Sequence, residues 1–196
     1  MHEIEILLFD GFDELDAIGP YEVLDNGRRG GAGLEVRLVT LDPTDTVTAS
    51  HGLEVVPQGT LGKPDLLIVP GGGWTTEDGG VRREVGAGEI PEAVAASHEA
   101  GSAVASVCTG AMILAEAGLL DDRPATTHHV AHEDLEATAE RIDARVVDDG
   151  DVVTAAGVTS GIDMALWLLE REFDPGLAKQ VEREMEYERR GDLHRN

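Results

Sequence analysis

The sequence predicts a three-layer α/β sandwich with a mostly parallel central sheet, because short apolar runs alternate with helical patterns along its 196 residues. Three of these runs are compact and are followed by turn residues, as in strands that are buried on both faces. We find no internal repeat or long linker, and the length suits one domain. Residues 1–196 are therefore expected to form a single domain.

Five strands are predicted from apolar runs, at residues 4–9, 35–41, 66–69, 103–107 and 152–156. Polar or Gly-rich turns follow three of the runs, and these turns cover residues 10–16, 71–73 and 108–110. In parallel sheets, reactive groups gather where the carboxyl ends of the strands meet. The three turns are therefore expected to converge.

Five helices are predicted between the strands, at residues 20–27, 91–100, 109–117, 133–142 and 162–172. Pro20 and Pro91 suit the first turn of a helix, where the missing N–H costs nothing. Residues 160–163 are expected to form a capping-box-like helix start, with Asp163 as its acidic member. Residues 26–33 are expected to form a surface connection, and the mixed charges of residues 182–190 a solvated helix.

Acidic residues dominate the composition, with 39 Asp and Glu against 15 Lys and Arg and a net charge of −24. Such a surface repels phosphates, so neither nucleic acid nor a membrane surface is expected as a partner. The acids are interleaved with regular apolar segments, which favours a folded chain over a disordered one. Only Lys63 and Lys179 are lysines. We interpret this acid-rich, lysine-poor composition as adaptation to molar salt, where screening shortens to about 3 Å.

The single cysteine excludes an internal disulfide framework. The first residues lack the pattern of a secretory signal, and no apolar run approaches the roughly 20 residues of a membrane span. A cytoplasmic location is expected.

Cys108 is the first candidate functional residue, because it ends one predicted strand and begins a helical pattern. A helix N-terminus favours the thiolate, which is the nucleophilic form of cysteine. Ser106, Thr109, Gly110 and Ala111 are small, as a strained nucleophile turn requires. An inert buried cysteine is the alternative, and position alone does not separate the two.

Two other features accompany the cysteine. The glycine run at residues 71–73 allows backbone N–H groups to approach a ligand or a developing oxyanion, although it lacks a phosphate-loop lysine. Asp16 lies between Leu15 and Ala17, and an apolar setting raises the pKa of a carboxyl group. Asp16 is therefore either a proton donor and acceptor near the thiol or a helix cap.

Four blocks resemble the ThiJ/PfpI (DJ-1/PfpI) superfamily, within the flavodoxin-like fold of class I glutamine amidotransferases. In order they are ILLFDGFDELDAIGPYEVL, DLLIVPGGG, ASVCTGAMILAEAGLLDDRPATTHH and AAGVTSGIDMALWLLE. The resemblance implies that Cys108 is the nucleophile and that Asp16 lies beside it. It also implies an oxyanion pocket from the backbone of Gly72 and Thr109. Further pocket residues are expected to be Gly71, His128 and Ile18.

The residue after the cysteine separates the subfamilies of this resemblance. PfpI-type peptidases resemble Cys-His-Gly, whereas this chain has Cys108-Thr109-Gly110, which argues against peptidase and glyoxalase activity of that type. The patterns LDxxGPxEVL, CTGAxxLAxAGLL and ATTH are similar to isocyanide hydratases and equally to the ligand-sensing half of AraC-type regulators. Those regulators append a basic helix-turn-helix region, and here an acidic segment follows instead, so a DNA-binding role is not expected.

A histidine cluster, His128, His129 and His132, raises the possibility of a metal site. His128 and His132 would share one face of a helix. However, the glutamate of a zinc-protease helix and an obvious third ligand are both missing. We expect no metal, and the ATTH resemblance implies that His128 lines the nucleophile pocket.

The sequence thus predicts a cysteine-dependent hydratase or hydrolase of a small electrophilic molecule, foremost an isonitrile converted to an N-substituted formamide. No cofactor is expected. The alternatives are a thiol-based stress or redox protein without sustained turnover, and a ligand-sensing or structural dimer. The expected partners are a small-molecule substrate and a second copy of the chain in a homodimer.

Overall fold

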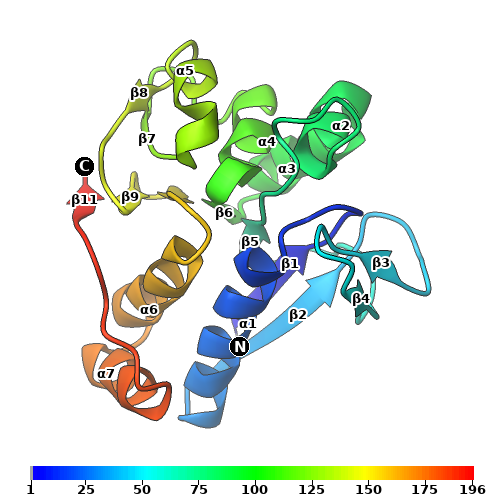
Figure 1. Cartoon of the computed structure of the whole chain (residues 1–196). Helices are drawn as coiled ribbons and strands as arrows, with labels where there is room; N and C mark the ends of the chain where they lie inside the picture. The colour runs from blue at the N-terminus through cyan, green and yellow to red at the C-terminus, as the bar shows by residue number, and fades with distance from the viewer. Residues whose placement is uncertain (1) are drawn as a thin grey trace.

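A computed structural model describes residues 2–196, which contain a seven-stranded sheet in the order β11-β9-β10-β6-β5-β1-β2 (Figure 1). Neighbouring strands are parallel except for β9 and β10. The prediction of a mostly parallel central sheet is therefore confirmed. The strands of the sheet are β1 (His2–Leu7), β2 (Leu34–Val39), β5 (Leu66–Val69), β6 (Ala103–Val107), β9 (Val146–Asp148), β10 (Val152–Ala155) and β11 (Leu193–Arg195).

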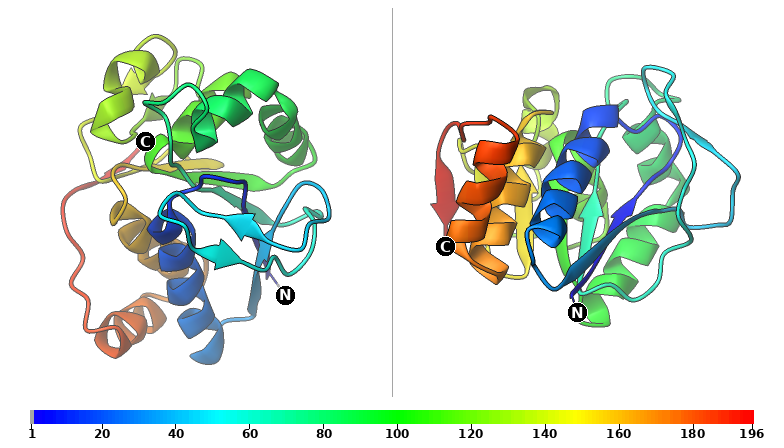
Figure 2. Two further views of the ribbon diagram at one scale, coloured as in Figure 1. Left: turned by 45° about the vertical axis from the view of Figure 1, so that its right-hand side comes forward. Right: turned by 90° about the horizontal axis from the view of Figure 1, so that it is seen from below.

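Helices cover both faces of the sheet, which completes the predicted three layers (Figure 2). On one face α1 (Glu14–Arg29), α6 (Ser160–Glu172) and α7 (Pro175–Glu184) pack together. On the other face α2 (Gly80–Ala87), α3 (Glu89–Glu99) and α4 (Ala111–Glu116) do the same. Across residues 2–196, no helix has both the length and the apolar character that a membrane crossing needs.

Small elements complete the fold. They are the pairs β3 (Val47–Thr48) with β4 (Glu54–Val55) and β7 (Pro124–Ala125) with β8 (Glu140–Arg141), the helix α5 (His132–Leu135), and the 3₁₀ turns η1 (Cys108–Gly110) and η2 (His129–Ala131). The sheet is buried on both sides, as β5 shows, since all four of its residues are inaccessible. This two-sided cover explains why the central strands are continuous apolar runs.

Helix α1 begins six residues before the predicted start, because Asp13 supplies the N-cap. Its carboxylate accepts a hydrogen bond from the Leu15 N–H at 3.2 Å. Pro20 consequently lies inside the helix, where it removes one backbone hydrogen bond, and not in the first turn as predicted. Pro91, in contrast, lies in the first turn of α3, as predicted.

Three further predictions differ from the structure. The helix expected at residues 133–142 is confined to α5, because the chain then turns to pair β8 with β7. The solvated helix expected at residues 182–190 ends at Glu184. The capping box is also wrong, because the Asp163 carboxylate does not cap α6 but accepts a hydrogen bond from Arg145 at 2.5 Å.

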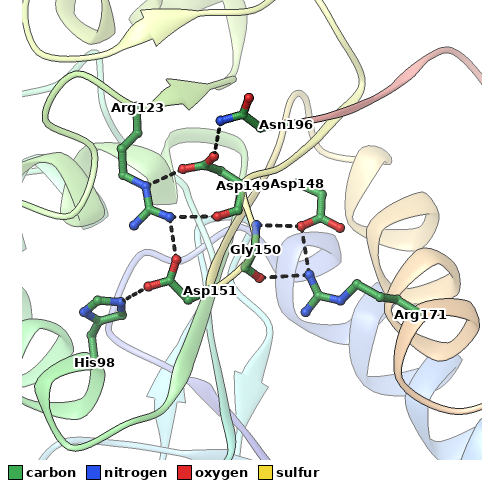
Figure 3. A network of polar contacts seen from close by, with 8 residues as sticks. All are labelled: His98, Arg123, Asp148, Asp149, Gly150, Asp151, Arg171 and Asn196. Carbon is green, nitrogen blue, oxygen red and sulfur yellow. Dashed lines mark hydrogen bonds and ion pairs between the residues drawn. The ribbon is translucent and has the colours of Figure 1, made fainter.

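A network of charged side chains holds the turn between β9 and β10 (Figure 3). The Arg123 guanidinium donates to Asp149 and to Asp151, both at 2.5 Å, and His98 contacts Asp151 at 2.7 Å. The network continues through Arg171, which donates to Asp148 at 2.9 Å, and Asn196, which donates to Asp149 at 2.8 Å. One turn is thereby joined to α3, α6 and the residue that follows β11.

Replacing Arg123 is expected to destabilise the fold in a pH-dependent way. The hydrogen bond from Arg123 is the main reason that the pKa of Asp151 is lowered to about 2. A carboxyl group with a lowered pKa stabilises the fold above its ordinary pKa and loses that contribution as pH falls from about 4 to about 2. Arg123→Gln should therefore cost about 1–2 kcal/mol at pH 7, because solvent screens part of the network.

Urea unfolding of the wild type and the variant at pH 7 and near pH 2.5 measures this difference. The matched control is Arg141→Gln, because Arg141 makes one ion pair with the half-exposed Glu136, and its loss should cost less than about 0.5 kcal/mol. An Arg123→Gln penalty that is equal at the two pH values would contradict the prediction.

Candidate functional site

The three turns at the carboxyl ends of β1, β5 and β6 meet, as the sequence predicts. The Gly71 N–H donates to Oδ2 of Asp16 and the Gly72 N–H donates to Oγ1 of Thr109, both at 2.9 Å. The Asp13 N–H closes the cluster by donating to the Gly71 carbonyl at 2.8 Å. Asp16, Gly71, Gly72, Thr109 and therefore Cys108 belong to one site.

The glycines of the site permit backbone segments to touch. A Cβ at Gly71 would lie 2.5 Å from the Thr109 nitrogen and 2.9 Å from Oδ2 of Asp16. A Cβ at Gly110 would lie 2.3 Å from the Val69 carbonyl oxygen. Neither distance is tolerated by backbone atoms, so glycine is required at both positions.

Cys108 has the geometry of a nucleophile turn. Its φ is +57°, a left-handed conformation that costs a residue other than glycine about 1–3 kcal/mol. The residue begins the turn η1 and is 5% exposed. Such strain persists where the surroundings impose it, and it is concentrated at active sites.

Asp16 is fully buried, and its environment raises its pKa to about 8. Burial is the main cause and the negative charge of Asp13 adds to it, while hydrogen bonds from the Gly71 N–H and the Cys108 thiol oppose the shift. The carboxyl group is therefore mostly protonated at neutral pH. The cap alternative is wrong, because Asp13 caps α1. Within residues 2–196, Oδ1 of Asp16 is buried without a hydrogen bond of normal geometry.

The thiol of Cys108 differs from the sequence expectation. Burial raises its pKa above the ordinary range, and the charge that Asp16 carries once it is ionised raises it further, whereas hydrogen bonds from the Thr109 backbone and side chain lower it. The expected preference for thiolate came from a helix N-terminus. That effect is weak here, because a 3₁₀ turn separates Cys108 from the short helix α4. The resting site therefore holds its protons on both sulfur and carboxyl.

Thr109 favours the thiolate form of Cys108 through both its N–H and its hydroxyl. The Gly72 N–H, which was expected to face an oxyanion, is instead engaged by Oγ1 of Thr109. Gly72 thus acts on the site through the Thr109 hydroxyl, whose oxygen it polarises. The Gly71 N–H is likewise occupied by Asp16.

His128 and Ile18 take no part in the hydrogen bonds that join Asp16 to Gly71 and Gly72 to Thr109. His128 is half-buried, and a Cβ at Gly157 would lie 3.4 Å from its ring. Burial lowers the pKa of His128, and the neighbouring charges of His129 and His132 lower it further. Its Nδ1 accepts from the Val130 N–H at 3.3 Å, and Ile18 is partly buried against the core.

One contact at the nucleophile was not predicted from the sequence. The hydroxyl of Thr127 donates to the Cys108 carbonyl oxygen at 2.8 Å, and Thr127 is completely buried. The ATTH block contains this residue, but nothing in its spacing indicates that the side chain reaches a carbonyl 19 residues earlier.

Groups with metal-ligand chemistry come together at a different place from the one that the histidine pattern suggested. Asp13, Glu14 and His51 bring one ligand atom each within 4.8 Å of one another. Two of the three residues already form a hydrogen-bonded pair, since Nδ1 of His51 lies 2.6 Å from Oε2 of Glu14. His132 instead approaches the Thr127 carbonyl oxygen, at 3.3 Å.

Known proteins are similar to this chain in sequence and in fold. The DJ-1/PfpI family matches residues 2–171. An isonitrile hydratase from Pseudomonas putida is 34% identical over 94% of this chain and 78% of that protein. A deglycase from Pyrococcus horikoshii is 30% identical over 87% of this chain and 96% of its own length. The crystal structure of a ThiJ/PfpI family protein from Pseudomonas syringae has a TM-score of 0.84 and 28% identity, covering 96% of this chain and 76% of that one. The resemblance read from the four sequence blocks is confirmed, and the chain belongs to the DJ-1/PfpI family.

Proposed function

We propose that this protein hydrates an isonitrile to an N-substituted formamide, with Cys108 as nucleophile and Asp16 as the proton-transfer group. The observation that carries the proposal is a buried cysteine at positive φ beside a carboxyl group whose pKa is raised to about 8. A protonated carboxyl group beside a nucleophile is suited to adding sulfur and hydrogen to the same carbon.

The first half of the reaction forms a covalent thioimidate. The Asp16 carboxyl group gives its proton to the terminal carbon of R–N≡C, and the carboxylate that remains takes the thiol proton as the sulfur of Cys108 bonds to that carbon. The acid is thereby restored. The donors of Thr109 stabilise the negative charge that develops at the sulfur as its proton leaves.

The second half consumes one water. Water adds to the thioimidate carbon, and the Asp16 carboxyl group relays a proton from the water to the nitrogen. The carbon–sulfur bond then breaks, the remaining hydroxyl proton returns to sulfur, and the formamide R–NH–CHO leaves. Atoms balance as R–N≡C plus H₂O, and the free thiol is regenerated.

The limited exposure of the thiol favours a substrate with a narrow reacting end. Cys108 is only 5% exposed, so the reacting end of the substrate must be narrow. The linear N≡C group meets this requirement, whereas a peptide carbonyl with substituents on both sides does not. The 34% identical relative named as an isonitrile hydratase supports the same substrate class.

The test is conversion of a series of alkyl and aryl isonitriles to formamides, followed by chromatography. We expect turnover by the wild type and none by Cys108→Ala. Intact-mass analysis of wild-type protein quenched during turnover should show an adduct equal to one isonitrile. Formamide production by Cys108→Ala at the wild-type rate would refute the role of the thiol.

The same assay separates the rival functions. Because one relative is named as a deglycase, glycated compounds are the second substrate class to try. Stoichiometric oxidation of Cys108 to a sulfinic acid without turnover of any substrate would favour the stress or redox alternative. The homodimer and the cytoplasmic location stay predictions.

A further inference from the structure

The conformation of Cys108 needs support from outside its own turn. At φ +57° the residue lies in a region that side chains other than glycine rarely adopt. On one side, Gly110 packs against the Val69 carbonyl, and on the other side Thr109 is held by Gly72. The Cys108 carbonyl oxygen accepts a hydrogen bond from the Thr127 hydroxyl at 2.8 Å.

Thr127 itself is rigidly placed. Its side chain is fully buried, and the N–H of the preceding Thr126 donates to Oγ1 of Thr154 in β10 at 2.9 Å. Its own carbonyl oxygen faces Nε2 of His132 at 3.3 Å. The donor that reaches Cys108 is thus tied to the central sheet and to α5, so it fixes the direction of the carbonyl it binds.

The carbonyl of Cys108 and the N–H of Thr109 belong to the same peptide group. Fixing the direction of the carbonyl therefore fixes the direction of that N–H, because the peptide is planar. A hydrogen bond accepted by the carbonyl also polarises the N–H and makes it a stronger donor. This N–H is one of the two groups of Thr109 that stabilise negative charge on the sulfur.

We propose that Thr127 is a positioning residue for the nucleophile, acting through the peptide group that joins Cys108 to Thr109. Its hydroxyl holds that peptide in the one orientation that directs the Thr109 N–H at the sulfur, and it strengthens the N–H as a donor. The inference rests on Cys108 being the nucleophile of the proposed function, and it does not depend on which substrate is used.

The test compares Thr127→Val, Thr127→Ala and Thr127→Ser by the rate of Cys108 alkylation with iodoacetamide between about pH 6 and pH 10. Val keeps the shape and removes the donor, Ala removes both, and Ser keeps the donor. We expect Val and Ala to react about three- to tenfold more slowly at a given pH, which displaces the profile upward by about half to one pH unit. Ser should follow the wild-type profile.

A second readout follows the donor directly. The amide proton resonance of Thr109 should move upfield in Thr127→Val and Thr127→Ala and stay near its wild-type position in Thr127→Ser, because a weaker donor is less deshielded. Thr126→Val is the matched control, since that neighbouring buried threonine is linked through its backbone N–H, and its profile should be that of the wild type.

The outcomes separate positioning from packing. A Ser variant as slow as Val, or a Val variant with the wild-type profile and an unmoved Thr109 resonance, would overturn the inference. If Val fails to fold, the comparison of Ala with Ser decides in the same way. Failure to hydrate isonitriles would affect the proposed function alone, because alkylation and the amide resonance need no substrate.

Discussion

Asp16→Asn is expected to abolish most turnover while making the protein more stable. Asparagine has nearly the same shape and can still accept the Gly71 hydrogen bond through its carbonyl oxygen, but it cannot donate a titratable proton. Isonitrile hydration should fall by about 100-fold or more, which is the usual value of a positioned acid. Iodoacetamide should still alkylate Cys108 at high pH, because the sulfur remains.

The gain in stability follows from the raised pKa. The folded state retains a proton on Asp16 up to about pH 8, whereas the unfolded chain releases it near the ordinary value of 3.8. The unfolding free energy of the wild type therefore falls as pH rises from about 4 to about 8, by on the order of 1.4 kcal/mol per unit. Asparagine has no titratable proton, so the unfolding free energy of the variant does not fall in this way as pH rises.

Urea unfolding of both proteins at pH 4 and pH 8 measures the effect. The two proteins should be similar at pH 4, and Asp16→Asn should be more stable by at least about 2 kcal/mol at pH 8. Activity assays of the wild type should show a matching loss as pH rises through about 8, where the acid ionises. A fully active Asn variant would defeat the mechanism.

The folded state is also expected to depend strongly on salt. A net charge of −24 on 196 residues leaves most carboxylates without a cationic partner even though many arginines are paired. At low ionic strength their repulsion opposes folding, and molar salt screens it within about 3 Å. We propose that the protein is adapted to molar salt, and we expect it to unfold in dilute buffer and refold in about 3 M potassium chloride.

Thermal melts from about 0.05 to 3 M potassium chloride test this expectation. A second protein neutralises four exposed acids that lie outside the ion pairs, through Asp42→Asn, Asp45→Asn, Glu54→Gln and Glu77→Gln. Its melting temperature at low salt should be higher than that of the wild type, and it should change less as salt is added. Sucrose, which stabilises folded proteins without screening charge, is the control solute. A melting temperature that is constant across the salt series would remove the case for salt adaptation.

Sequence patterns predict the buried strands well and the ends of helices poorly. Residues 66–69 and 103–107 coincide with β5 and β6, because strands covered on both faces must be apolar throughout. The start of α1 was missed because Pro20 resembles a helix start, whereas the true signal is the Asp13 cap. Strands of two or three residues, such as β9, owe their existence to neighbours in space and have no periodic signal.

The sequence predicts those residues of the candidate site that lie in short contiguous motifs. The positions of Cys108, Asp16 and the glycine turn follow from where strands end. The raised pKa of Asp16 follows from its apolar neighbours in the sequence. The protonation of Cys108 does not follow, because burial is a tertiary property and outweighs the helix terminus that favoured thiolate. The Thr127 contact was equally out of reach, since a side chain donating to a carbonyl far along the chain has no sequence signature.

The charged network around the β9–β10 turn has a consequence for the order of events in folding. Its members come from positions 98, 123, 148–151, 171 and 196, so closing it requires loops that span half of the chain (Figure 3). Because the entropy of closing these loops must be overcome first, we expect the network to form after the transition state, with a φ-value near zero for Arg123→Gln. Interactions absent from the transition state govern how fast the native state opens, so we expect this turn to affect the lifetime of the folded molecule more than the speed at which it forms.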